Sequence, residues 1–278
     1  MTRPANRTRP VNIISGEPAV STPGSLIVTF AGLHLRNIGG WIAVADLISL
    51  LRPAGAQEAA VRQALVRLKT RGFLRTERRR EKAGYRLTDT GTADLELGDA
   101  RIFRFGEAAE SDGWVLAVFS VPEQARSERH RLRSQLGRLG FGTVGPGVWI
   151  APVALAQRSR RQLEAQGLGG YISWFTAHNL DPAQVARWWD LDALQALYEQ
   201  FLLRWEPQLK HEWSGEQAFS ADLLLVEGWR QFPRIDPGLP GALLPGHWSG
   251  RRAFEMFGAL RDRWSRPALE FVAARVGR

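Results

Sequence analysis

The sequence predicts an α+β chain with three folded parts, and three observations lead to that prediction. A segment with helical spacing at residues 56–70 runs directly into a basic hairpin pattern at residues 73–88. Short apolar strands alternate with helices between residues 114 and 178. The last hundred residues keep apolar side chains at helical spacing. With 278 residues, the chain is long enough to bury more than one hydrophobic core.

The composition excludes several kinds of protein. The chain has no cysteine, which rules out disulfides, a thiolate nucleophile and zinc fingers built on cysteine. No apolar run approaches the roughly 20 residues that cross a bilayer, and the N-terminus lacks the apolar core of a signal peptide. We therefore expect a cytoplasmic protein without a membrane partner. Residues 1–22 are rich in Pro, Arg and Thr, which predicts a mobile tail.

The positive charge is concentrated towards the N-terminal end. Of the net charge of +9, residues 1–98 contribute +7, residues 99–180 contribute +3 and residues 181–278 contribute −1. A basic excess confined to one part of a chain is typical of a domain that binds a polyanion. This distribution makes residues 23–98 the first place to look for a nucleic-acid-binding motif.

Residues 23–98 contain three predicted helices followed by a hairpin. Residues 25–35 and 44–55 form the first two amphipathic helices, and Pro53 and Gly55 break the second. The third helix ends before Gly72, and its apolar stripe consists of Val61, Ala64, Leu65 and Leu68. Three helices and a hairpin in this order predict a winged helix-turn-helix.

The opposite face of the third helix carries side chains that suit the major groove of DNA. Arginine pairs with guanine and glutamine with adenine, each through two hydrogen bonds. The residues predicted to read bases are Arg62, Gln63, Val66, Arg67 and Thr70. An ordinary amphipathic surface helix would also carry a polar face, so this helix alone leaves both interpretations open.

The hairpin that follows favours DNA. Residues 73–80 and 85–88 are the predicted strands, with Gly84 available for the turn. A basic tip suits contact with phosphates or with the minor groove beside the recognition helix. The basic residues predicted at this tip are Arg78, Arg79, Arg80 and Lys82. A solvated loop is the ordinary alternative, but the position directly after three helices favours a wing.

Residues 99–180 are predicted to form a second domain, after a polar link at residues 105–113. Its expected elements are a strand at 114–121, a helix at 124–140, a glycine-bent strand or strand pair at 141–152, a helix at 154–166 and a strand at 170–178. This β-α-β-α-β order suggests a ferredoxin-like α+β domain. Such domains often dimerise or carry ligands, so the fold alone assigns no function.

Residues 181–278 are predicted to form a helical domain. Helices are expected from residue 183 to a stop at Pro207, at 218–232 and at 250–275, with a proline-rich loop at 233–248. Eight of the eleven tryptophans lie beyond residue 170. Core packing is the ordinary interpretation of these tryptophans, and a pocket for an aromatic ligand is the sharper alternative.

The sequence lacks the usual catalytic motifs. The five histidines are scattered, no two of them are four residues apart, and no GxxxxGK[ST] loop occurs. The glycines of residues 140–147 could cradle a phosphate, but no helix follows directly, and a bend in a strand explains them. We therefore predict a binding protein with no catalytic residue, metal or cofactor.

Several segments together resemble the PaaX family of bacterial transcriptional regulators, which is named for the repressor of phenylacetic acid degradation. The resemblance extends from about residue 23 to residue 275. The matching segments are SLIVTFAG, AAVRQALVRLKTRGFLRTERR, YRLTDTG, LRSQLGRLGFGTVGPGVWIAP, WDLDALQALYEQFLLRW and FPRIDPGLPGALLPGHWSGRRAF. The central and C-terminal segments are specific to the family, whereas the winged-helix pattern alone is not.

The resemblance implies a central domain similar to the ferredoxin-like Cas2 proteins. It also implies a homodimer on a pseudo-palindromic operator, nucleoid-associated in a bacterial cytoplasm. Such a dimer represses a catabolic operon for aromatic compounds until an aryl-CoA thioester such as phenylacetyl-CoA releases it. The family often has a His-Glu-Tyr-Arg run where residues 227–230 read Glu-Gly-Trp-Arg. This departure puts the inherited effector in doubt.

An effector of this kind would bind between the central and C-terminal domains, with arginines at its phosphates and tryptophans at its aromatic group. The residues assigned to this site are Trp174, His178, Arg187, Trp189 and Arg230. One alternative is a metal-dependent nuclease, but residues 119–122 at the end of the first central strand lack the acidic metal ligand of the Cas2 proteins. The other alternative is an architectural DNA binder without an effector.

Overall fold

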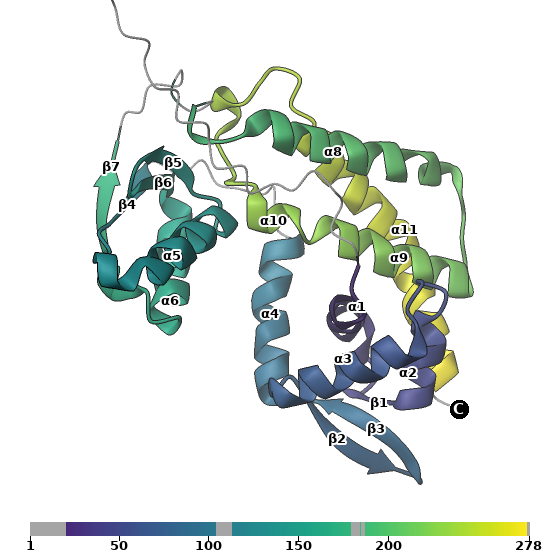
Figure 1. The fold of residues 1–278 in the computed structure, drawn as a ribbon. Helices are drawn as coiled ribbons and strands as arrows, with labels where there is room; N and C mark the ends of the chain where they lie inside the picture. The colour runs from purple at the N-terminus through teal and green to yellow at the C-terminus, as the bar shows by residue number, and fades with distance from the viewer. Residues whose placement is uncertain (1–20, 104–112, 179–183, 185–186, 277–278) are drawn as a thin grey trace, which may run out of the picture. The chain divides into compact units, whose positions relative to one another are not determined.

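The computed structural model describes residues 21–103, 113–178, 184 and 187–276 (Figure 1). Most of the predicted tail at residues 1–22 and of the predicted link at residues 105–113 lies outside the described residues. Among the described residues, no helix is both long enough and apolar enough to cross a membrane.

The chain divides into two compact units. The first, called here the helical unit, contains the described residues 21–103, 199–231 and 251–276. The second, called the sheet unit, contains those within 113–198 and 232–250. Residues 181–278, which we predicted to form one helical domain, are therefore divided between the two units.

The helical unit begins with helix α1 (Pro23–Phe30), which continues into a π-helical turn, η1 (Ala31–Leu35). The Thr22 side chain caps α1 by accepting a hydrogen bond of 3.2 Å from the Ser25 amide. The next elements are strand β1 (Trp41–Ala43), helix α2 (Val44–Leu51) and helix α3 (Glu58–Thr70). The three predicted helices are present, and β1 is an element that the sequence did not reveal.

Strands β2 (Leu74–Arg79) and β3 (Lys82–Leu87) form the predicted hairpin, and β1 pairs with β3 at its other edge. All pairings are antiparallel. The hairpin turn consists of Arg80 and Glu81, with φ angles of 43° and 65°. A two-residue hairpin turn needs this left-handed backbone at both positions. The sequence suggested a turn at Gly84, and that prediction is wrong.

Gly84 lies within β3, opposite Ala43 on one side and Glu77 on the other. A Cβ atom at this position would come within 2.4 Å of the Ile42 carbonyl oxygen and 2.5 Å of the Trp41 ring. The glycine is required because β1 and the Trp41 ring approach the β3 backbone too closely for any side chain.

Three further helices complete the helical unit (Figure 1). They are α4 (Asp89–Phe103), α9 (Gly215–Trp229) and α11 (Gly250–Val276). Thr88 begins α4 by accepting a hydrogen bond of 3.0 Å from the Gly91 amide. Helix α8 (Leu191–Trp205) contains the boundary between the two units, at residue 198.

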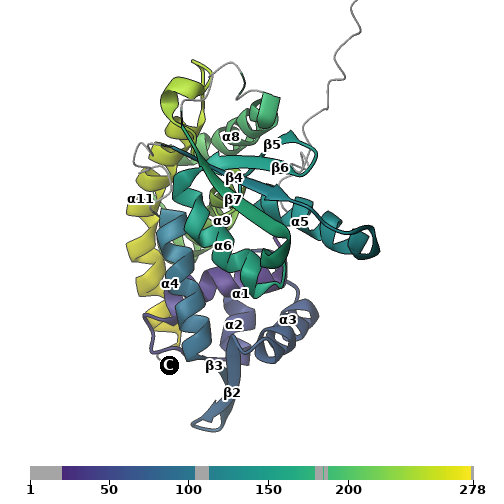
Figure 2. The same cartoon turned by 90° about the vertical axis from the view of Figure 1, so that its left-hand side faces the viewer.

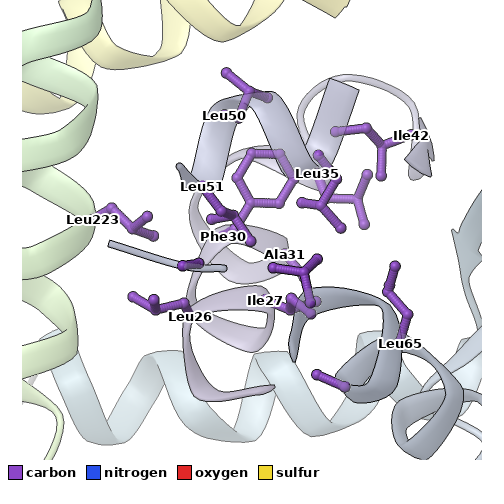
Figure 3. Close-up of a cluster of buried hydrophobic side chains, with 14 of the residues drawn as sticks. Leu26, Ile27, Phe30, Ala31, Leu35, Ile42, Leu50, Leu51, Leu65 and Leu223 are labelled. Atoms are coloured by element: carbon purple, nitrogen blue, oxygen red, sulfur yellow. The ribbon is translucent and has the colours of Figure 1, made fainter. Parts of the chain in front are cut away.

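One hydrophobic core joins the N-terminal and C-terminal segments of the helical unit. Figure 3 shows Leu26 and Phe30 of α1 beside Leu51 of α2 and Leu223 of α9. Phe219 from α9 and Val272 from α11 belong to the same cluster and are completely buried. Each such side chain stabilises the fold by about 1.5–3 kcal/mol. The helices near the C-terminus are thus part of the core on which α1 and α3 rest.

The sheet unit has a βαββαβ order. Its elements are β4 (Trp114–Phe119), α5 (Arg126–Arg138), β5 (Gly142–Gly145), β6 (Val148–Pro152), α6 (Ala156–Ala165) and β7 (Ile172–Ala177). The strand order is β5-β6-β4-β7, antiparallel throughout. This topology is that of a ferredoxin-like domain. The glycine-rich segment at residues 141–152 forms a strand pair, which was one of the two predicted possibilities.

The two faces of this sheet are covered differently. Leu132, Leu136 and Leu163 of α5 and α6 pack on the face that carries Val115 and Ala117. The other face, with Trp114 and Ile150, packs against Trp189, Leu191 and Leu239. The described residues also include short helical turns, namely η2 (Glu123–Ala125), η3 (Val153–Leu155), η4 (Gly169–Tyr171), η5 (Glu206–Lys210), α10 (Phe232–Ile235) and η6 (Gly241–Leu243).

Most of the tryptophans pack in the cores. Six of the eleven are buried, namely Trp114, Trp149, Trp189, Trp205, Trp229 and Trp264. The other five are partly exposed. The ordinary interpretation therefore holds for the buried six.

Candidate nucleic-acid interface

Helix α3 presents two distinct faces. Its four predicted core residues, Val61, Ala64, Leu65 and Leu68, are at most 6% exposed. The five side chains predicted to read bases are all exposed, together with those of Lys69 and Arg71. Helix α3 lies at the surface of the helical unit, beside the β2–β3 hairpin (Figures 1 and 2). The polar face of α3 is therefore exposed, as contact with the major groove of DNA requires.

The exposed face of α3 has an apolar centre. Val66 is 57% exposed although it is an aliphatic residue within a helix. Its neighbours one turn away are Arg62, Gln63 and Thr70, and the Thr70 hydroxyl donates a hydrogen bond of 3.1 Å to the Val66 carbonyl. An exposed methyl group among donors and acceptors can contact a thymine methyl while its neighbours bind base edges.

Arg62 is held by another residue of the same helix. Its Nε and Nη2 atoms donate to Glu58 Oε1 at 3.0 and 2.8 Å. Both side chains are more than half exposed, so the pair stabilises the helix by only about 0.3–0.5 kcal/mol. Arg67 makes no ion pair with any described residue. Arg67 is therefore available to DNA at once, whereas Arg62 must first leave Glu58.

The hairpin contains a charge network that sequence reasoning missed. Glu77 pairs with three arginines: Arg75 at 3.1 Å, Arg79 at 2.6 Å and Arg86 at 2.8 Å. The indole nitrogen of Trp41 donates to the Glu77 carbonyl oxygen at 3.0 Å, and the Arg79 guanidinium lies over the Trp41 ring. Residues 75, 77 and 79 alternate along β2, and that spacing was the available signal.

The four predicted basic residues of the wing therefore differ in their freedom. Arg79 is bound to Glu77 and Trp41, and Arg78 donates to the Glu81 carbonyl oxygen at 3.0 Å. Arg80 and Lys82 are exposed and make no ion pair with a described residue. Arg80 also holds a left-handed backbone conformation that costs a non-glycine residue free energy. The tip thus presents Arg80 and Lys82, while Arg79 stiffens the hairpin.

Four of the five residues assigned to an effector site, Trp174, His178, Arg187 and Trp189, lie in the sheet unit. Trp174 packs on the helix-covered face of the sheet, under the Arg160 guanidinium. Trp189 packs on the opposite face, where its indole nitrogen donates to the Gly140 carbonyl oxygen at 2.9 Å. His178 and Arg187 are exposed. The structure therefore does not assemble one pocket from these residues within the sheet unit.

Arg230 belongs to the helical unit, where it contacts α1. Its Nη1 atom donates to the Thr29 hydroxyl at 2.8 Å and to the Ser25 carbonyl oxygen at 3.2 Å. Thr29 in turn donates to Glu227 at 2.5 Å, and Glu227 lies 3.3 Å from Arg230. This network ties the end of α9 to the first helix of the predicted DNA-binding domain. Glu227 and Trp229 are two of the positions where the chain departs from the family's His-Glu-Tyr-Arg run. Glu227 belongs to this network, and the Trp229 indole nitrogen donates a hydrogen bond to the Ile102 carbonyl oxygen.

A second polar group is buried in the same core. His34 is 1% exposed, and neither ring nitrogen has a hydrogen-bond partner among the described residues. Burial, and then the charge of Arg261, lowers the pKa of His34 to about 3. Arg261 itself pairs with both carboxylate oxygens of the buried Asp222. Burial raises the pKa of Asp222, while the Arg261 partner opposes that rise.

The described residues contain no group of three or more acidic or histidine side chains that could hold a metal ion. The surface formed by α3 and the β2–β3 hairpin combines exposed arginines with the exposed amide of Gln63 and the exposed Val66.

Comparison with known proteins places the chain in a family. Three family models match, described as PaaX-like protein (residues 22–91), PaaX protein central Cas2-like domain (residues 107–188) and PaaX-like protein C-terminal domain (residues 189–274). The chain belongs to the PaaX family. The Cas2-like description of the central model agrees with the βαββαβ topology of the sheet unit.

Two relatives illustrate the range of the likeness. Transcriptional repressor PaaX of Escherichia coli (strain K12) is 29% identical over 262 residues, which cover 90% of this chain and 82% of that protein. The solved structure of an uncharacterised protein, Rv0674 from Mycobacterium tuberculosis, covers 92% of this chain and 99% of its own, with a TM-score of 0.61 and 24% identity. The second likeness shows a shared fold.

Proposed function

We propose that this chain is a DNA-binding transcriptional regulator whose residues 23–98 form a winged helix-turn-helix domain. The observation that carries the proposal is the exposed polar face of α3 beside a hairpin with an exposed basic tip. The description of the Escherichia coli relative as a transcriptional repressor supports it. Repression is accordingly the proposed mode of action, and no catalytic step is assigned to the chain.

In this proposal, α3 and the hairpin tip bind different parts of the DNA. Gln63 and Arg67 bind base edges in the major groove, Val66 contacts a thymine methyl, and Arg62 joins them after leaving Glu58. Arg80 and Lys82 at the hairpin tip bind phosphates or the adjacent minor groove. Base contacts supply the sequence preference and phosphate contacts supply affinity.

A homodimer would place two α3 helices on successive turns of DNA. Winged-helix and helix-turn-helix dimers bind half-sites about 34–36 Å apart on a pseudo-palindrome. This chain is proposed to act in that form, as the family resemblance implies. Its operator would then show two-fold symmetry.

An acyl-CoA thioester is the proposed effector, with phenylacetyl-CoA as the first compound to test. A ligand can release the repressor only if it binds better to a conformation that fits DNA poorly. The Ser25–Thr29–Glu227–Arg230 network offers a route, because a shift of α9 would move α1 and the core beneath α3. The regulated genes are then expected to serve the breakdown of an aromatic acid.

The direct test is a gel-shift titration on the promoter DNA of the chain's own gene cluster, with and without phenylacetyl-CoA. The proposal predicts tight binding at physiological salt, and at least 1000-fold weaker binding to unrelated duplex. It also predicts release by the thioester but not by free coenzyme A. Equal affinity for every duplex would contradict sequence-specific regulation. Tight binding that no thioester alters would overturn the effector assignment and leave the regulator in place.

A further inference from the structure

In the βαββαβ domain of the sheet unit, the charged side chains are concentrated on the two helices. Its four strands contain no Asp, Glu, Lys or Arg. Helices α5 and α6 contain eight arginines against two glutamates, a net charge of +6. Both helices pack on the same face of the sheet through Leu132, Leu136 and Leu163. Their outer faces therefore form one basic layer, which the net charge of +3 for residues 99–180 conceals.

Few of these arginines are neutralised. Arg129 and Arg131 pair with Glu123 and Glu128, at 3.3 and 2.5 Å. Arg160 lies over the Trp174 ring at 5.3 Å. The remaining arginines make no ion pair with any described residue, and they are Arg126, Arg133, Arg138, Arg158 and Arg161. All of these except the half-buried Arg158 are exposed.

A cluster of uncompensated positive charges destabilises the compact state through self-repulsion. A polyanion that binds across the layer would remove this repulsion. The charge distribution therefore points to a partner with many closely spaced negative charges.

We propose that the outer faces of α5 and α6 bind the phosphate backbone of duplex DNA without reading its sequence. The proposal rests on the DNA-binding function proposed above and adds a second contact surface on the other unit. Arg126 and Arg133 lie seven residues apart on one stripe of α5, with the exposed His130 between them. Arg138 and Arg161 extend the charged layer to the end of α5 and to α6.

The length of the layer favours DNA over a small anion. Thirteen residues of α5 extend over about 20 Å at 1.5 Å per residue. Along that distance a DNA duplex carries roughly twelve phosphates, at one per 1.7 Å. A ligand with a few phosphates at one end would neutralise only part of the layer. Arginines outnumber the other exposed polar side chains on α5 and α6, which are Ser127, His130, Gln157 and Glu164. Such a surface suits phosphate contacts more than the reading of base edges.

The test is the salt dependence of DNA binding, measured by fluorescence anisotropy on the promoter fragment and on a scrambled duplex. Two double variants remove exposed arginines from the layer, Arg126→Gln with Arg133→Gln and Arg138→Gln with Arg161→Gln. The matched control is Arg251→Gln with Arg266→Gln, which removes the same charge from α11, where both arginines pair with glutamates. Circular dichroism verifies that each variant is folded.

The slope of log K against log salt concentration becomes less steep by about 0.9 for each phosphate that a variant no longer binds. We expect each layer variant to bind one or two fewer phosphates, with the same decrease in affinity on both duplexes and an unchanged preference for the promoter. The control keeps the wild-type slope. If both layer variants also keep the wild-type slope, the surface does not touch DNA and the second proposal is wrong. A wild-type preference for the promoter would still support the proposed function. If the wild-type chain binds neither duplex, both proposals are wrong.

Discussion

Two basic surfaces of this chain differ in what surrounds their arginines. On the helical unit, the α3 and hairpin surface combines arginines with the amide of Gln63, the exposed Val66 and the carboxylates of Glu58 and Glu77. On the sheet unit, the α5 and α6 layer consists of arginines with few partners. Carboxylates hold several arginines of the first surface in place, among them Arg62 and Arg79. Most arginines of the second surface make no ion pair with a described residue.

The difference shows that the amount of charge and its arrangement are separate properties. Affinity for any duplex grows with the number of phosphates neutralised, whatever their sequence. Discrimination between sequences needs donors, acceptors and methyl groups at set positions. Only the α3 and hairpin surface has all three, so removal of side chains there is expected to change sequence preference.

The largest expected effect is on the bases read by α3. Replacing Gln63 or Arg67 with alanine removes one bidentate interaction from each half-site, and each is worth about 1–3 kcal/mol, or roughly 5- to 150-fold in affinity. Affinity for scrambled duplex falls much less. The control is Lys69→Ala, which removes one charge from the same helix outside the predicted base-reading set. An equal decrease in affinity for both duplexes would mean that α3 binds phosphates and does not read bases.

The next effect is a pH dependence of stability that is expected in the helical unit and comes from His34. The pKa of His34 is about 3 in the folded chain and 6.5 in the unfolded chain, so below pH 6.5 only the unfolded chain takes up a proton. The free energy of unfolding is therefore unaffected by His34 above pH 6.5 and falls by about 1.4 kcal/mol per pH unit between pH 6.5 and pH 3. Between pH 7 and pH 5, the helical unit should lose about 2 kcal/mol relative to His34→Leu.

Urea unfolding of wild type and His34→Leu at pH 7, 6 and 5, followed by hydrogen exchange in α1 and in β4, measures this loss. Asp222 is present in both proteins, so its opposite pH dependence cancels in the difference. His130→Ala, which removes an exposed histidine of the sheet unit, is the matched control variant. Parallel pH profiles for wild type and His34→Leu would show that the imidazole has a partner and is not an isolated neutral group.

A smaller effect concerns the exposed valine of α3. Val66→Ala should lower affinity for the operator by about 1 kcal/mol, because the shorter side chain no longer reaches the thymine methyl group. The fold should keep its stability, since the side chain is 57% exposed. Replacing thymine by uracil at the contacted position should reproduce the decrease in wild type and have no further effect in the variant. Additive decreases would place Val66 away from the methyl group.

The smallest effect tests the role of Glu77. Glu77→Gln releases Arg75, Arg79 and Arg86 from a shared carboxylate and raises the net charge by one. The hairpin should lose at most about 1 kcal/mol of stability, because these pairs are partly exposed. Affinity for scrambled duplex should rise a few-fold, and the preference for the operator should fall. A lower affinity for both duplexes would mean that the ordered hairpin matters more than free charge.

The local pattern predicted much of the fold. The stripe of α3, the hairpin and the alternating elements of the sheet unit follow from spacing alone, because each has a repeat that matches its secondary structure. Strand β1 was missed because three residues, Trp41–Ala43, are too few to show a repeat. The turn was misplaced because Gly84 serves a close approach of β1 and not a bend in the chain.

What the sequence could not supply was the tertiary partner of each polar group. Arg79 and Arg80 are alike in sequence, yet one is bound by Glu77 and Trp41 and the other is exposed at the tip. Arg230 was assigned to an effector site, but it contacts Ser25 and Thr29, some 200 positions earlier in the chain. Such pairings depend on long-range packing, which leaves no periodic signal.

The most direct test of the central claim is selection of bound duplexes from a random pool by the wild-type chain and by the Arg67→Ala variant. If α3 reads bases, the wild type enriches a two-fold symmetric motif, and the variant loses preference at one position in each half-site. If the variant enriches the same motif with the same preference, or if the wild type enriches none, α3 does not read the sequence and the assignment of the interface is wrong.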